Sequence, residues 1–185
     1  MTMSPGLRKL ALTVHVTVSV GWFGAVAGFL ALAVAGLISE DGQTVRGSYV
    51  AMDLVTRIVI VPFCLASLVT GVVQSLGTPW GLFRHYWVVI KLLLTVLSTV
   101  ILLVHTQLIS YLAEVAAETA LSSADHRELR IQLIADAGAA LVVLLVATVL
   151  AVYKPRGTTR YGRRRLQAQR AVPMHAPLPP PGAPV

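Results

Sequence analysis

Four long apolar stretches without a charged residue alternate with short polar stretches along this chain of 185 residues. The apolar stretches are Leu10–Ser39, Ile58–Phe83, Leu92–Ala113 and Ala137–Tyr153. A helix of about 20 apolar residues crosses the hydrocarbon core of a bilayer, which is roughly 30 Å thick. Backbone groups in lipid must be hydrogen-bonded within the protein, and a single segment achieves this as a helix. The pattern therefore predicts an all-α protein, a polytopic membrane four-helix bundle.

Breaks in the pattern set the expected ends of the spans. We expect helices over about 10–38, 50–76, 87–112 and 131–153, which together form one transmembrane domain over 1–156. Pro62 lies inside the second span, where it removes a backbone hydrogen bond, so we expect a bend and an unbonded carbonyl near residue 58. Ser122 and Asp125 resemble a capping box ahead of the fourth span.

Composition narrows the classes of function. The chain is 56% hydrophobic and only 12% charged, which is unlike an ordinary soluble domain. Its net charge of +7 would favour nucleic acid in a soluble protein. Here the excess lies after Tyr153 without a folded basic module, so we expect anionic lipids and no nucleic acid as its partner. The sequence has no phosphate loop, nucleophile elbow, CxxC or HExxH motif, so we expect no catalytic residue and no metal site.

Charge is distributed unevenly between the two sides of the predicted bundle. All eight acidic residues map to one side, and most of the 15 basic residues map to the other. Because cytoplasmic loops carry the excess of Lys and Arg, we expect both termini to be cytoplasmic in a multi-pass protein of the cell membrane. Residues 157–185 are basic and then proline-rich, and we expect a disordered cytoplasmic tail there.

The first span has features of a signal peptide. Arg8 and Lys9 precede it, and Ala33-Val34-Ala35 resembles a cleavage site. Its apolar stretch is longer than the ~7–15 residues of a usual signal-peptide core, so we expect the span to be retained. A mature protein that begins at Gly36 is the alternative.

Small residues line one side of the first span and favour close helix contacts. The set comprises Gly21, Gly24, Gly28, Ala31 and Ala35. We expect contacts within the chain, with contacts between copies or with another membrane protein as the alternative. The single cysteine, Cys64, excludes an intrachain disulfide and is expected to be a small core residue.

A few polar residues lie where lipid should exclude them, and these are the candidate functional residues. His15 is the deepest ionisable residue, and Ser19 and Trp22 share its helix face at i+4 and i+7. We interpret His15 first as a neutral side chain bonded to a neighbouring helix. A metal or haem ligand and a proton-handling group are the alternatives.

A second polar stripe runs along the third span. It consists of Lys91, Thr95, Ser98 and His105, which the helical period places on one face. Lys91 lies in the same half of the membrane as His15 and is expected to reach the interface with its long side chain. His105 lies nearer the outer surface, where we expect a hydrogen-bonding role.

A polar outer cluster is expected from Asp53, Arg57, His105 and Asp136. Asp53 and Arg57 have the i, i+4 spacing of an ion pair on one helix. Their face is expected to continue through small and polar residues, namely Cys64, Ser67, Gly71 and Ser75. One interpretation is a vestibule open to the outside. The other, which we favour, is an interfacial ion pair that holds the helix ends.

The order of these residues resembles known membrane proteins. The sequences LTVH at 12–15, GWFG at 21–24 and YKPRG at 153–157 resemble a family of bacterial four-helix integral membrane proteins without an assigned function, over roughly residues 7–165. More distantly, His15 followed by Trp22 and Gly24, with Trp87 before Lys91, is similar to the membrane protoporphyrinogen oxidase family of four-helix haem proteins. The copper-resistance D family has a comparable first helix. This resemblance implies haem as the cofactor, His15 as its ligand and Lys91 as a polar partner.

Three functions follow from these observations. The leading one is a structural or accessory membrane subunit without its own catalytic site, working as a homo-oligomer or with another membrane protein. The second is a b-type haem redox protein ligated through His15, which as an enzyme would be a haem-dependent membrane oxidoreductase. The third is a pathway for a small solute or for protons through the polar outer cluster.

Overall fold

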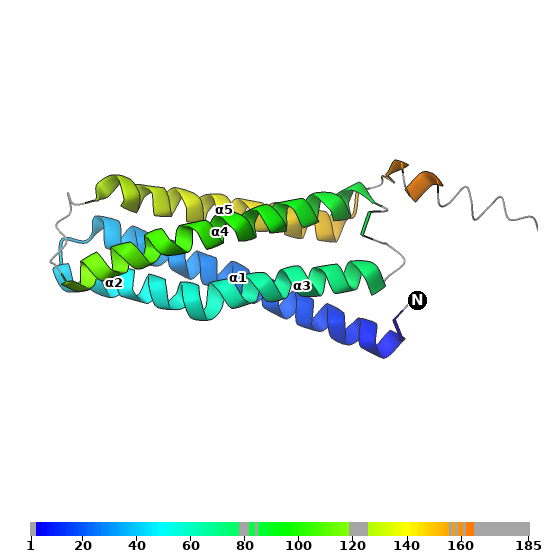
Figure 1. Ribbon diagram of the computed structural model, residues 1–185, viewed down its shortest axis with the longest axis horizontal. Helices are drawn as coiled ribbons and strands as arrows, with labels where there is room; N and C mark the ends of the chain where they lie inside the picture. The colour runs from blue at the N-terminus through cyan, green and yellow to red at the C-terminus, as the bar shows by residue number, and fades with distance from the viewer. Residues whose placement is uncertain are drawn as a thin grey trace, which may run out of the picture.

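Four long helical rods lie side by side in the computed structural model of the protein (Figure 1). The structure describes residues 3–77, 82–83, 85–118, 126–155, 157, 159–160 and 162–164. In those residues every regular element is helical, and each rod is long and apolar enough to cross a membrane. The prediction of an all-α fold with four helices long and apolar enough to span a membrane is confirmed.

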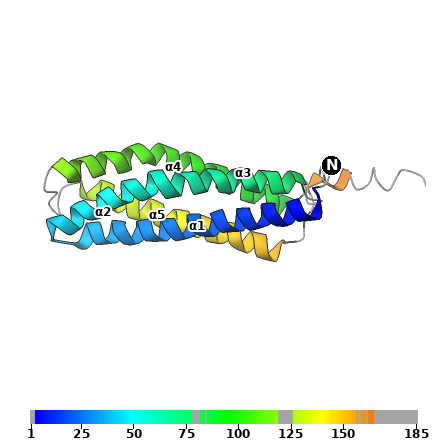
Figure 2. The ribbon, with the colours of Figure 1, turned by 90° about the horizontal axis from the view of Figure 1, so that it is seen from below.

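The rods run up and down the bundle in sequence order. The first is α1 (Pro5–Ile38), and the second combines α2 (Gly42–Val55), the π-helix η1 (Thr56–Ile60) and α3 (Val61–Gly77). The third is α4 (Tyr86–Glu118), and the fourth is α5 (Arg127–Tyr153). Both described chain ends lie at the same end of the bundle, which we call the terminal end (Figures 1 and 2). The opposite end, where α1 meets α2, is called the distal end.

Side-chain caps fix where the first two rods begin. The Ser4 hydroxyl accepts a hydrogen bond from the Leu7 amide, and Pro5 occupies the first helical position, where its missing N–H is not needed. Asp41 accepts hydrogen bonds from the backbone of Gln43 and Thr44 and from the Thr44 hydroxyl, and these bonds lower the pKa of its carboxyl group. The helix therefore starts at Gly42, ahead of the span expected to begin near residue 50.

Pro62 lies two residues after the end of the π-helix, within a rod that stays helical from Gly42 to Gly77. A proline inside a helix removes one backbone donor and crowds the carbonyl four residues earlier. The chain responds by widening the preceding turn, so that the Val61 amide bonds to the Thr56 carbonyl. A π-turn holds one residue more than an α-turn, and it therefore rotates the faces of α2 and α3 relative to each other.

This rotation corrects the prediction that the face of Asp53 and Arg57 continues through Cys64 and Ser67. The buried side chains around the π-turn are those of Met52, Thr56, Ile60 and Cys64, and not those of Asp53 and Arg57. Arg57 leaves 58% of its side chain exposed. Beyond the π-turn the prediction is correct, because Cys64 and Ser67 are buried. The prediction assumed a regular α-helix over residues 53–75, and such a helix does not contain the extra residue of the π-turn.

Arg130 ties three rods together at the distal end of the bundle. Only 1% of this residue is exposed, although arginine is usually a surface residue. Its Nε donates to the Tyr49 hydroxyl at 2.7 Å, its guanidinium lies over the Tyr49 ring, and its Nη2 donates to the Gly36 carbonyl. Gly36 is required there, because an added Cβ would lie 3.0 Å from the Tyr49 ring. The contacts join α1, α2 and α5.

Small residues of α1 fall on two different faces. An added Cβ at Gly21 would collide with the Phe63 ring of α3, so this glycine mediates the close contact that the sequence predicts. Gly24 and Gly28 have no atom of another residue within 4 Å of such a Cβ, and both are exposed. The expectation of contacts within the chain is therefore wrong for these two glycines.

Some sequence predictions fall outside the described residues. These are the capping pair Ser122 and Asp125 and the tail beyond residue 164. The described start of the tail makes contacts with the bundle: the Thr159 hydroxyl donates to the Phe83 carbonyl and accepts from the Gly162 amide. The disorder expected over 157–185 remains a prediction for the residues beyond this turn.

The first prediction concerns the Arg130 contacts. Tyr49→Phe removes the hydroxyl that accepts from Nε and leaves a buried cationic donor without that partner. We expect the free energy of unfolding in detergent to fall by about 1.5–3 kcal/mol, the range for hydrogen bonds to charged groups. Tyr111→Phe, on an exposed tyrosine of α4, is the matched control and should change it little. Equal effects of the two variants would contradict the assigned role of Arg130.

The second prediction compares two glycines on one helix. Gly21→Ala places a methyl group against Phe63, and overpacking of this kind costs about 1–3 kcal/mol. Gly24→Ala meets open space and gains helix propensity of roughly 0.5–1 kcal/mol. Thermal unfolding in detergent should therefore move the transition midpoint down for Gly21→Ala and leave it unchanged or raise it for Gly24→Ala. Destabilisation by Gly24→Ala would show that this face is packed.

Candidate functional site

A cavity of about 180 Å³ lies inside the bundle, between its middle and the distal end. Residues of α1, η1, α4 and α5 line it, and most of them are apolar. Trp22 and Phe29 of α1 and Thr56 of η1 form the inner wall, and all three are buried. Two lining residues, Ile101 of α4 and Ala139 of α5, are exposed. The cavity therefore reaches the outer surface of the bundle between α4 and α5.

His105 and Asp136 face each other in the cavity wall. His105 Nδ1 lies 2.8 Å from the Ile101 carbonyl oxygen, which can only accept, so Nδ1 carries a proton. His105 Nε2 lies 3.1 Å from Asp136 Oδ2 and 3.4 Å from the Gln132 amide nitrogen. A lone pair on Nε2 would repel a carboxylate oxygen at this distance. When His105 is protonated, its Nε2 and the Asp136 carboxylate form an ion pair.

Two polar atoms in the cavity wall lack a hydrogen bond from the described residues. They are Trp22 Nε1 and Asp136 Oδ2, and both are shielded from solvent. His105 is close enough to Oδ2 for an ion pair, but the direction of the contact does not meet hydrogen-bond geometry. A buried indole N–H usually finds a partner, and an unsatisfied buried polar group costs about 1–3 kcal/mol. One donor and one acceptor thus remain unused at this cavity.

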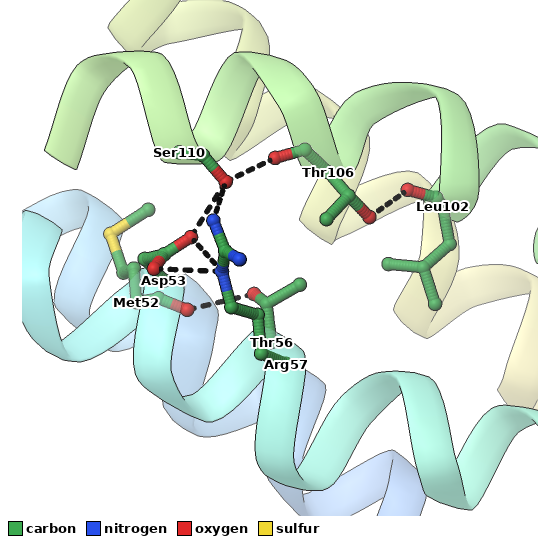
Figure 3. Close-up of polar contacts among 7 residues, drawn as sticks. All are labelled: Met52, Asp53, Thr56, Arg57, Leu102, Thr106 and Ser110. Atoms are coloured by element: carbon green, nitrogen blue, oxygen red, sulfur yellow. Dashed lines mark hydrogen bonds and ion pairs between the residues drawn. The ribbon is translucent and has the colours of Figure 1, made fainter. Parts of the chain in front are cut away.

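Asp53 and Arg57 form a second polar group outside the cavity (Figure 3). Arg57 Nε donates to both Asp53 carboxylate oxygens at 3.0 Å, as the i, i+4 spacing predicts. Figure 3 shows Ser110 of α4 completing the group: its hydroxyl lies 2.8 Å from Asp53 Oδ1 and 2.8 Å from Arg57 Nη2. The group links the second rod to α4 on a partly exposed surface.

The predicted polar outer cluster is therefore two separate groups. His105 and Asp136 belong to the cavity, whereas Asp53 and Arg57 bridge two helices beside it. Thr56 lies between Asp53 and Arg57 in sequence but contributes to the cavity wall, with its hydroxyl bonded to the Met52 carbonyl at 2.7 Å. It continues the buried face of Tyr49 and Met52, from which Arg57 is turned away.

His15 lies at the contact between α1 and α3, towards the terminal end. Its Nδ1 is 2.9 Å from the Thr70 hydroxyl oxygen. That hydroxyl donates its one proton to the Ala66 carbonyl at 2.6 Å, so it accepts from His15 and fixes the proton on Nδ1. Gly71 leaves room for the ring, since an added Cβ would lie 3.2 Å from His15 Cε1. The expected histidine bonded to a neighbouring helix is confirmed.

The face shared by His15, Ser19 and Trp22 is also confirmed. The Ser19 hydroxyl lies 2.8 Å from that of Ser67 on α3, and Trp22 is buried with 3% exposed. On α4, Ser98 and His105 both line the cavity, as the predicted stripe requires. Lys91, at the other end of that stripe, lies close enough to His15 for the two to interact electrostatically.

These positions bear on the haem hypothesis. Fixing the proton on Nδ1 leaves Nε2 as the ligating nitrogen, which is the usual arrangement of a metal-bound histidine. The cavity, however, is lined by neither His15 nor Lys91, and it is far smaller than a porphyrin. The described residues also contain no group of three or more His, Cys, Asp or Glu side chains that could hold a metal ion. We see no fit for an enclosed haem at the cavity, and ligation through His15 stays a prediction.

Comparison with protein-family models, curated proteins and solved structures finds no match for this chain. The resemblances noted in the sequence therefore stay predictions. The function must be argued from the geometry alone.

Several residues that shape these sites were not singled out as candidates from the sequence. Thr70 and Ser110 complete the bonds of His15 and Asp53, and Gln132 lies beside His105. Gln132 and Asp136 are one helical turn apart, a spacing that would have marked a polar face entering the fourth span. No local signal points to Thr70 or Ser110, because hydroxyl groups are common in membrane helices.

The third prediction tests the link between α1 and α3. Thr70→Val removes the acceptor of the His15 Nδ1 proton, and we expect the free energy of unfolding in detergent to fall by about 0.5–1.5 kcal/mol. Thr13→Val is the matched control, because the exposed Thr13 hydroxyl bonds only to its own helix at Lys9. Similar values for the two variants would show that His15 is not held by Thr70.

Proposed function

We propose that the protein binds a small, mainly apolar solute in the cavity, as the binding step of a solute pathway in the membrane. The cavity volume of about 180 Å³ supports this proposal. An engineered protein cavity of about 150 Å³ with apolar walls binds benzene, so the volume suits a molecule with one substituted ring. If nothing fills a space of this size between the helices, its lining loses packing contacts and the protein is less stable.

The position of the cavity suggests how a solute enters. Exposed Ile101 and Ala139 bring its mouth to the surface between α4 and α5, at the depth of the charge-free run that contains His105. An apolar solute dissolved in lipid could enter there without crossing a polar layer. With both termini placed in the cytoplasm by the excess of basic residues, the cavity would lie in the outer half of the membrane. That sidedness and the cell membrane itself are part of the proposal.

The structural or accessory role expected from the sequence is compatible with solute binding. Gly24 and Gly28 leave an exposed strip on α1 that would admit another helix closely. We keep this role as a prediction, because solute binding rests on a more specific observation.

The fourth prediction is that toluene binds in the cavity. Equilibrium dialysis of the purified protein in detergent with radiolabelled toluene should give one saturable site above detergent partitioning. Ala140→Leu adds a larger side chain to the lining and should weaken binding at least about tenfold, or roughly 1.4 kcal/mol.

Ala27→Leu is the matched control for this experiment. It adds the same side chain to an exposed position of α1 and should leave toluene binding unchanged. If toluene uptake is not saturable, or if both variants bind it as well as the parent protein, the proposed function is wrong.

A further inference from the structure

Two polar atoms at the cavity that lack a hydrogen bond among the described residues restrict what can occupy it. Trp22 Nε1 can only donate a hydrogen bond, and a carboxylate oxygen such as Asp136 Oδ2 readily accepts one. The indole belongs to α1 and the carboxyl group to α5, and both residues line the same cavity. A ligand that fills so small a volume contacts its lining on several sides. An occupant with both an acceptor and a donor would therefore supply hydrogen bonds that the described residues do not give these two atoms.

Other hydroxyl and thiol groups inside the bundle do have hydrogen-bond partners. The Cys64 thiol lies 3.1 Å from the Thr99 hydroxyl, and the Thr56 hydroxyl bonds to a backbone carbonyl. Among the described residues only one further buried side-chain atom, Gln74 Nε2, lacks a hydrogen-bond partner, and Gln74 does not line the cavity. Two of the three such atoms thus belong to residues that line the cavity.

Charge at the cavity restricts the occupant further. Most of the lining is apolar, and the Asp136 carboxyl group already faces His105 Nε2 at 3.1 Å. An ion entering the apolar space would lack a counter-charge there, and burying an unpaired charge is strongly unfavourable. The wall is therefore suited to a neutral molecule.

We propose that the cavity selects a neutral molecule of about one ring that carries a hydroxyl group. Its oxygen would accept from the Trp22 indole N–H, and its O–H would donate to Asp136 Oδ2. The apolar part of the molecule would contact Phe29 and Ile101. This inference rests on the proposed function, because it names the class of solute for the same cavity.

Three probes of similar shape test the inference by equilibrium dialysis. Toluene has no hydrogen-bonding group, anisole has an acceptor only, and phenol has an acceptor and a donor. After correction for detergent partitioning, we expect anisole to bind about fivefold more tightly than toluene and phenol about fivefold more tightly than anisole. Each factor corresponds to one net hydrogen bond of about 1 kcal/mol.

Two variants show which of the two atoms produces each increase in affinity. The partitioning of a probe into detergent is the same for every variant and so cancels when variants are compared. Trp22→Phe keeps an aromatic ring and removes the N–H, so it should abolish the advantage of anisole over toluene. Asp136→Leu should abolish the advantage of phenol over anisole and leave toluene bound. Asp53→Leu changes a carboxyl group outside the cavity and should alter none of the ratios. Retained toluene binding shows that the cavity of each variant is intact.

The outcomes separate this inference from the proposed function. Suppose that toluene binds, that Ala140→Leu weakens its binding, and that phenol and anisole bind no more tightly than toluene. The cavity is then a solute site, and the proposed selectivity for a hydroxyl group is wrong. If Ala140→Leu weakens the binding of none of the three probes, the proposed function is wrong as well. Should Asp136→Leu fail to fold, the comparison of phenol with anisole on the parent protein still decides the inference.

Discussion

Within a bilayer, apolar side chains gain almost nothing by leaving lipid for the protein, and this constraint governs the whole bundle. Helices must then associate through close packing and through hydrogen bonds between side chains. Links of this kind join the first, second and fourth rods, and the second rod to the third. Arg130 joins α5 to α1 and α2, His15 with Thr70 joins α1 to α3, and Asp53 with Ser110 joins the second rod to α4. The residues that appeared out of place in the sequence are largely the ones that hold the helices together.

Pro62 determines which face of the second rod points inward beyond the cavity. It is accommodated by a π-turn over Thr56–Ile60, which carries one extra residue. The buried face of Tyr49, Met52 and Thr56 therefore continues in Ile60 and Cys64, while Arg57 is exposed and paired with Asp53. Thr56 and Ile60, at the two ends of the π-turn, both line the cavity. π-turns inside helices are frequent at functional sites, and here the geometric consequence is visible.

The sequence predicts the helices well and the sites only in part. Charge-free runs determine the rods because the bilayer leaves the backbone no alternative. The face of His15, Ser19 and Trp22 is also predictable, since α1 is regular throughout. The face of Asp53 is not, because the response of a helix to proline depends on its neighbours. Arg130 could not be found either: a single arginine near a helix end normally reaches the interface, and its burial depends on Gly36 lying opposite.

The two halves of the bundle treat their polar groups differently, and this difference supports placing the solute site between α4 and α5. Between α1 and α3, hydroxyl groups and His15 are paired in short bonds, and Gly21 and Gly71 bring the backbones close. Between α4 and α5, His105 faces Gln132 and Asp136, and the cavity opens beside them. Polar and apolar groups are thus presented together at this opening, as binding of a solute with both kinds of group requires.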